Sequence, residues 1–169
     1  MIPKLSRVAV LWDRNAPSGE TAWKEIQLPA RALGLELHSV EIAPADKVES
    51  GFKEAIKAGS GALTVNLSPM INSNQRRIVE LAAKNRLPAI YPRSEFVQGG
   101  GLMSYGADRT EGFKRVAVMI DKILKGTRPA DIPVEQPTKF EFIVNLKAAN
   151  QIGLTIPQSV LFRADKVIK

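Results

Sequence analysis

The feature that most constrains this sequence is a regular alternation of short apolar runs with stretches of helical periodicity. The first run, Arg7–Trp12, is apolar after its arginine, which is typical of a strand covered on both faces. Ser18 is placed to cap the helix that follows, and Gly34 is suited to end it. The same reasoning predicts further strands at 35–42, 61–66, 87–91, 102–106 and 140–145. It predicts further helices at 46–58, 72–84, 108–124 and 146–152.

Strands and helices that alternate in this way form a parallel sheet with helices on both faces. We therefore predict an α/β fold with an open, mostly parallel sheet. The chain is expected to form one lobe in three parts. These are core strand–helix units at 1–101, a crossover strand and helix at 102–126, and a proline-rich connector, last strand and C-terminal tail at 127–169.

Composition removes several classes of function. The 169 residues include no Cys and a single His, His38, which excludes disulfide bonds, thiolate catalysis and His-rich or Cys-ligated metal sites. His38 falls in a predicted strand, where we interpret it as an exposed side chain and not as a general base. The net charge of +7 is spread along the chain without interleaved aromatic residues, so we expect no nucleic-acid partner. We also expect no cofactor and no metal.

The first residues lack the basic, apolar and small-residue segments of a secretion signal. No apolar run approaches the roughly 18 residues of a membrane-spanning helix. We therefore expect a cytoplasmic location if Met1 is the natural start.

Ligands of open parallel sheets bind beyond the carboxyl ends of the strands, where the strand order switches. This rule selects the loops 13–18, 66–73, 91–94 and 105–108. Their side chains are suited to hydrogen bonding more than to acid–base chemistry, and together with helix N-termini they suit a small anion such as a carboxylate. The candidate ligand-binding residues are Asp13, Asn15, Ser18, Asn66, Ser68, Tyr91 and Ser94. The alternative is that such residues only cap helices and form turns.

Three other features have competing interpretations. Asp13 ends the first strand and is a candidate phospho-acceptor, although no acidic cluster accompanies it in the sequence. Gly99–Gly101 lacks the Lys-Ser/Thr of a phosphate-binding loop, so we interpret it as a turn that requires a positive φ. Trp23 lies on the apolar face of its helix and is expected in the core. Trp12 fits either the core or a pocket.

Two stretches closely resemble a known family. One is Leu87–Tyr91 with Glu95–Val97 and Gly99–Gly106, and the other is Ile123–Gly126 with Pro129–Glu141 and Val144–Ala149. They resemble the ABC transporter substrate-binding proteins that include tryptophan- and tyrosine-type binding proteins. Leu154–Pro157 and Ala164–Asp165 are similar to the usual ending of that family.

The resemblance implies one flavodoxin-like lobe of a type I periplasmic binding protein, which closes with a second lobe on a small amino-acid-like ligand. It implies capture of a solute for import without catalysis, an ABC permease as partner in a full-length protein, and a periplasmic or extracellular location. The loops 13–18, 68–71 and 91–94 match ligand-contacting loops of the family. Ser68 stands where many members carry an acid, and Pro29 also departs from the family pattern. Only the second half of the family is covered, so we expect weak or absent ligand binding by this chain alone.

The crossover segment has a physical consequence of its own. The helix within Leu102–Lys125 carries an apolar stripe that is costly to leave in water, and its residues are Phe113, Val116, Ile120 and Leu124. The segment must either fold back onto its own lobe or complete a second copy, and we expect a homodimer by one of these routes. Two functions remain as alternatives. One is a flavodoxin-like enzyme or phospho-receiver that uses Asp13, and the other is an oligomerising structural remnant without a ligand.

Overall fold

The computed structural model describes residues 2–42 and 47–169. Its elements in the first half are β1 (Arg7–Trp12), α1 (Gly19–Ala32), β2 (Glu36–Glu41), α2 (Val48–Lys57), β3 (Ala62–Val65), α3 (Pro69–Ser73), α4 (Gln75–Lys84) and β4 (Ala89–Tyr91). The second half contains α5 (Ser94–Gln98), β5 (Met103–Ala107), α6 (Arg109–Leu124), the 3-10 turn η2 (Pro129–Asp131), β6 (Phe140–Asn145), α7 (Leu146–Gln151), α8 (Gln158–Leu161) and β7 (Lys166–Ile168).

These strands form one sheet in the order β2-β1-β3-β4-β5-β6-β7. All neighbours are parallel except β5 and β6, which are antiparallel. The chain passes from β1 to β2 on one side and then crosses back to β3 on the other, so the order switches between β1 and β3. The expected α/β fold with a mostly parallel sheet is confirmed.

Helices cover both faces of the sheet, as expected. Leu11 pairs with Val40, and a Cβ on Gly51 of α2 would lie 2.7 Å from Val40, so α2 packs tightly on this face. The same face continues into one buried cluster that includes Phe52 of α2 and Ile78 of α4. α1 lies on the opposite face, where Trp23 stacks on Trp12 at a centroid distance of 6.0 Å.

Most predicted elements are found within a few residues, and the differences have local causes. The expected helix at 72–84 is divided into α3 and α4 at Asn74, whose side-chain amide donates to the Met70 carbonyl (2.9 Å). The expected helix at 46–58 begins at Val48, and Asp46 lies outside the described residues. The short elements α5, α8, η2 and β7 were not predicted, so the expected C-terminal tail contains a helix and a strand.

The positive backbone φ expected in the Gly99–Gly101 turn is found at Gly100 (99°). Gly34 also has a positive φ (67°) just after α1, as predicted for the residue that ends this helix.

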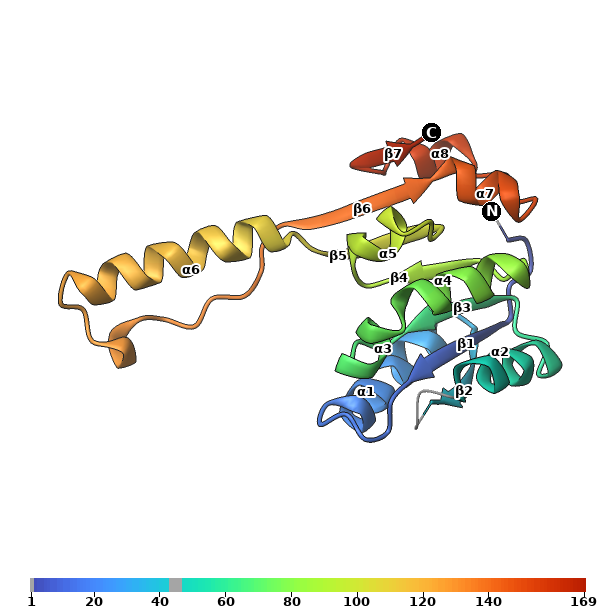
Figure 1. Ribbon diagram of the computed structural model, residues 1–169, viewed down its shortest axis with the longest axis horizontal. Helices are drawn as coiled ribbons and strands as arrows, with labels where there is room; N and C mark the ends of the chain where they lie inside the picture. Colours follow the sequence, from blue (N-terminus) through green and yellow to red (C-terminus); the bar gives the residue numbers. More distant parts are fainter. Residues whose placement is uncertain (1, 43–46) are drawn as a thin grey trace.

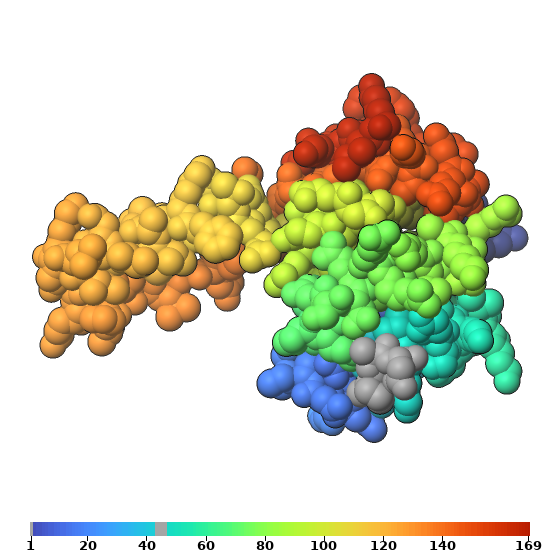
Figure 2. Space-filling view, viewed as in Figure 1, coloured from blue at the N-terminus to red at the C-terminus, as the bar shows by residue number. Residues whose placement is uncertain are grey.

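α6 departs most clearly from a flavodoxin-like arrangement. It does not fold back onto its own sheet but projects away from it, and the chain returns alongside it through η2 to β6 (Figures 1 and 2). None of the residues of α6 is buried. Of the two routes expected for the crossover segment, folding back onto the same lobe is therefore wrong. We call residues 108–139 the arm.

Candidate ligand-binding site

The switch in strand order places the predicted ligand loops on one edge of the sheet. β1 and β3 are parallel neighbours with Leu11 opposite Val65, and the Asn66 N–H donates to the Leu11 carbonyl (2.9 Å). The loops that begin at Asp13 and Asn66 therefore emerge side by side. β4 follows β3 in the sheet, and the loop with Ser94 emerges from the same edge.

The Asp13 carboxylate is occupied by its own turn. Asp13 is 8% exposed, and its Oδ1 accepts the backbone N–H of Asn15 (2.9 Å). Its carbonyl accepts the N–H of Ala16 (3.2 Å), and a Cβ at Gly19 would collide with that same carbonyl oxygen. These contacts are those of a turn former that leads the chain into α1.

Asn15 and Ser18 are exposed in the same loop. Ser18 stands at the N-cap position of α1, as predicted, but its side chain makes no capping hydrogen bond. Capping therefore does not use the Ser18 hydroxyl, which is left to solvent or to a ligand.

On the neighbouring loop, Ser68 caps α3. It is 6% exposed, and its Oγ accepts the backbone N–H of Ile71 (3.1 Å). Asn66 is half-buried, and its Nδ2 is buried without a hydrogen-bond partner among residues 2–42 and 47–169. Ser68 therefore caps a helix, which was the alternative to ligand binding. The Asn66 side-chain amide, by contrast, keeps a donor that no described residue accepts.

Tyr91 belongs to the core. Its side chain is 1% exposed and stacks on Phe96 at 4.7 Å between ring centroids. Burial raises the pKa of the Tyr91 hydroxyl well above its usual value, so the group remains neutral. The ring therefore supports the strand end but does not line its open surface.

Ser94 lines a groove of about 530 Å³ beside the root of α6. The groove lies between α5, the end of β5 and the first turn of α6, and its polar lining includes Ser94, Glu95, Ser104, Asp108, Arg109 and Glu141. Apart from Ser94, none of these was predicted as a site residue. The loop 105–108 had been selected, but α5, which carries Glu95, was not predicted.

An ion pair lies in the lining of this groove. Arg109 Nη1 lies 2.7 Å from Glu95 Oε1, and the guanidinium also stands 5.7 Å from the centre of the Phe113 ring. Burial raises the pKa of the Glu95 carboxyl, but its backbone hydrogen bond and the Arg109 guanidinium outweigh burial and lower the pKa overall. Glu95 is therefore an anion near neutral pH.

Two other predictions concern residues away from this edge. His38 of β2 is partly buried and not exposed as expected, and its Nε2 lies 3.3 Å from Glu54 Oε1 of α2. Trp12 is 2% exposed, and its Nε1 donates to Ser39 Oγ (2.8 Å). Of the two interpretations of Trp12, the core is the one found.

The described residues, 2–42 and 47–169, contain no group of three or more His, Asp or Glu side chains able to hold a metal ion. Within the same residues, no helix has the length and apolar character needed to cross a membrane.

The sheet begins in the order β2-β1-β3-β4-β5 and carries polar loops at the switch in strand order, which is where α/β proteins with open sheets bind their ligands. A family model described as ABC transporter substrate binding protein matches residues 1–168, so the chain belongs to this family.

Solved structures agree in fold over the whole chain. A structure from Streptococcus pneumonia, described as an ABC domain in complex with L-Trp, is 26% identical with a TM-score of 0.86, and the match covers 98% of this chain and 57% of that one. A conserved domain protein from Vibrio cholerae is 21% identical with a TM-score of 0.87, covering 98% and 56%.

The ligand-free, open substrate binding protein CD0873 from Clostridium difficile is 20% identical with a TM-score of 0.75, covering 99% and 56%. The chain thus spans a little more than half the length of each of these proteins. No match was found among curated proteins.

Proposed function

We propose that this chain forms one lobe of a solute-binding protein of an ABC importer, and that it binds a small amino-acid-like ligand without catalysis. The observation that supports the proposal is that three loops with hydrogen-bonding side chains follow the carboxyl ends of the neighbouring parallel strands β1, β3 and β4, in a member of this family. The residues proposed to contact the ligand directly are Asn15, Ser18, Asn66 and Ser94. Asp13, Ser68 and Tyr91 are proposed to hold these loops in place.

An aromatic amino acid is the first ligand to test. The Streptococcus pneumonia structure of a relative is described as a complex with L-Trp. Within the described residues, the Asn66 Nδ2 has no hydrogen-bond partner and the Ser18 hydroxyl makes no capping bond, and both donors suit a ligand carboxylate.

We expect weak binding by these 169 residues, because affinity for a small ligand depends on burying most of its surface. A single open edge contacts a ligand on one side only. A Kd on the order of 1 mM corresponds to roughly 4 kcal/mol, which is within reach of a few hydrogen bonds and one apolar contact.

The experiment is a titration of the isotopically labelled chain with L-Trp, L-Tyr and L-Leu, followed by amide chemical shifts. Shift changes that saturate and lie in the loops 13–18, 66–68 and 92–94 would support the proposal. Asn66→Ala should weaken them, while the matched control Asn85→Ala, at the end of α4, should not. A submicromolar Kd would overturn the one-sided site, and shifts confined to other surfaces would overturn its location.

The phospho-receiver alternative is not favoured, because Asp13 Oδ1 is held by the Asn15 N–H. We further propose an ABC permease as the partner of the full-length protein and a site of action outside the cytoplasmic membrane, both on the strength of the family. Finally, we propose that the chain self-associates through Leu102–Lys125, since α6 buries none of its side chains.

A further inference from the structure

The groove beside the root of α6 is rich in acids, although the chain as a whole is basic. The net charge of the chain is +7, whereas the charged residues of the groove lining are three acids and one base, namely Glu95, Asp108, Glu141 and Arg109. Fixed charges of one sign in a cleft concentrate ligands of the opposite charge. The groove therefore favours a cation over an anion.

The groove lies on the same edge of the sheet as the proposed ligand loops. β4 and β5 are parallel, with Tyr91 opposite Ser104, so the segments 92–94 and 106–108 both follow the carboxyl ends of strands. A Cβ on Gly106 would collide with the Pro92 carbonyl oxygen, so these two segments are in contact. All of these lining residues belong to this chain, and their chemistry does not depend on what covers the open side of the groove.

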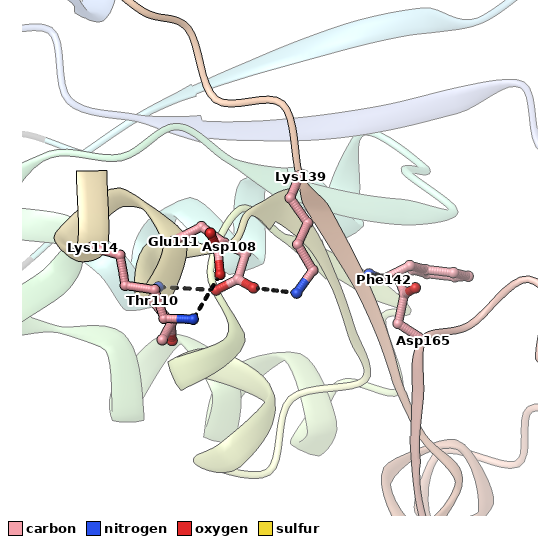
Figure 3. A network of polar contacts seen from close by, with 7 residues as sticks. All are labelled: Asp108, Thr110, Glu111, Lys114, Lys139, Phe142 and Asp165. Carbon is pink, nitrogen blue, oxygen red and sulfur yellow. Dashed lines mark hydrogen bonds and ion pairs between the residues drawn. The ribbon is translucent and has the colours of Figure 1, made fainter. Parts of the chain in front are cut away.

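Of the three acids, Asp108 is used by the fold. Its Oδ1 accepts the Thr110 N–H, and its Oδ2 lies 2.9 Å from Lys139 Nζ, as Figure 3 shows. Glu141 lies opposite Gly106 in the pairing of β5 with β6, which places its side chain on the same face of the sheet. Because Lys139 offsets the charge of Asp108, Glu95 and Glu141 are the acids that act on a ligand.

Glu95 has one carboxylate oxygen that the fold does not use. Its Oε1 lies 2.7 Å from Arg109 Nη1, whereas its Oε2 is buried and has no hydrogen-bond partner within residues 2–42 and 47–169. A buried carboxylate oxygen without a donor is unfavourable, and a ligand N–H at this position removes the penalty. Asp13, the one candidate ligand residue with a carboxylate, is instead 8% exposed and has its Oδ1 held by the Asn15 N–H.

Two serine hydroxyls in the lining are further acceptors. Ser94 is half-buried and Ser104 is 2% exposed. An ammonium group has three N–H donors and no acceptor, which matches one carboxylate oxygen and two hydroxyls. A ligand carboxylate would instead lie beside the like charges of Glu95 and Glu141. Since the acids of the described residues form no group of three able to hold a metal ion, an organic cation is the better match.

We propose that this groove binds the ammonium group of the ligand, with Glu95 Oε2 as its anionic partner. This inference rests on the proposed function and specifies the ligand as a primary amine. Ser94 and Ser104 accept the other two N–H groups, and Arg109 positions the Glu95 carboxylate by holding Oε1.

The first experiment compares two probes that differ only in the charged group. Tryptamine carries an ammonium and no carboxylate, and indole-3-propionate carries a carboxylate and no ammonium on the same indole and linker. Each is titrated into the isotopically labelled chain, and the amide shifts are followed. We expect tryptamine to cause shifts that saturate within 92–98 and 104–110, and indole-3-propionate to cause none there. Equal shifts from both probes, or shifts from indole-3-propionate alone, would overturn the proposal.

The second experiment tests Glu95 itself. Glu95→Gln should raise the Kd for tryptamine about fivefold or more, because the ligand loses a charge-assisted hydrogen bond. The matched control Glu80→Gln removes the same charge from an exposed ion pair with Arg76 (2.9 Å) and should leave the Kd unchanged. Arg109→Met keeps the carboxylate and removes its competing partner, so it should bind tryptamine at least as tightly. Equal weakening by Glu95→Gln and Arg109→Met, in variants with native circular dichroism, would mean that the ion pair only shapes the groove.

The ammonium site and the proposed function fail in different ways. L-Trp shifts in the loops 13–18 and 66–68, together with no tryptamine shifts in the groove, would leave the proposed function standing and overturn the ammonium site. Tryptamine shifts in the groove, without shifts from L-Trp, L-Tyr or L-Leu in those loops, would support the ammonium site and overturn the proposed amino-acid ligand.

Discussion

α4 and α6 obey the same sequence rules and have opposite environments. α4 buries Ile78, Val79 and Ala82 on one face, whereas α6 is longer and buries nothing. Both helices are amphipathic, and α6 also has the better N-cap, since Asp108 accepts the Thr110 N–H at 2.9 Å while Asn74 makes no capping bond. The comparison teaches that an apolar stripe shows that a helix needs a partner but does not identify the partner.

The largest test of this comparison is a pair of Phe→Ala substitutions. Phe52 of α2 is 2% exposed and Phe113 of α6 is 66% exposed. Phe52→Ala should lower the free energy of unfolding by about 3–5 kcal/mol, because it leaves a cavity in the core. Phe113→Ala should change it by less than about 0.5 kcal/mol in dilute samples. Urea denaturation measures both, and equal losses would show that α6 is packed against its own lobe.

A pair of glycines gives the next largest difference. A Cβ on Gly101 would lie 2.7 Å from both the Phe96 carbonyl and the Tyr91 ring, whereas a Cβ on Gly112 of α6 would meet nothing within 4 Å. Gly101→Ala should therefore destabilise the lobe by about 1–3 kcal/mol.

Gly112→Ala should instead stabilise α6 by about 0.5–1 kcal/mol, because alanine loses less backbone entropy in a helix interior. Hydrogen exchange of the α6 amides reads this out directly. Slower exchange in Gly112→Ala is expected, and faster exchange would mean that position 112 requires a conformation only glycine adopts.

The mostly parallel sheet and most of its strands were predictable, because local periodicity, turn residues and the alternation of strands with helices indicate them. Elements and side-chain pairs that depend on contacts between distant parts of the chain were not predictable. The three-residue strand β7 exists only through pairing with β6, in which Val144 lies opposite Val167. α5 has five residues, too few to show a helical period, so Glu95 and its pairing with Arg109 were missed.

The candidate site likewise has features that the sequence predicts and features that it does not. The prediction that the loops 13–18 and 66–73 lie on one edge of the sheet is correct, because it depends only on the order and direction of the strands. Which side chains remain available depends on local hydrogen bonds that the sequence does not reveal. Ser68 and Ser18 both stand at helix N-caps, yet only Ser68 makes the capping bond.

These two serines allow a smaller test within the candidate site. Ser68→Ala should lower the free energy of unfolding by about 1 kcal/mol, because the Ile71 N–H loses its acceptor. Ser18→Ala should leave stability within about 0.5 kcal/mol. Thermal denaturation measures both. A loss of ligand shifts in Ser18→Ala at unchanged stability would then report a direct contact, whereas equal destabilisation by the two would show that Ser18 also caps its helix.

The smallest effect is expected at the root of the arm and depends on pH. The hydrogen bond from the Lys139 ammonium lowers the pKa of the Asp108 carboxyl (Figure 3). Partial burial raises this pKa, and the hydrogen bond from the Thr110 N–H lowers it further. Because the folded pKa lies below the unfolded value of about 3.9, the Asp108 contacts stabilise the root above that value and are lost as the pH falls through the folded pKa. The Thr110 amide shift should therefore titrate at a pH below the ordinary pKa of an Asp carboxyl. Asp108→Asn should abolish this titration while retaining the cap, and Lys139→Met should move it upward. A titration at the ordinary pKa in the unaltered chain would mean that the ion pair does not form.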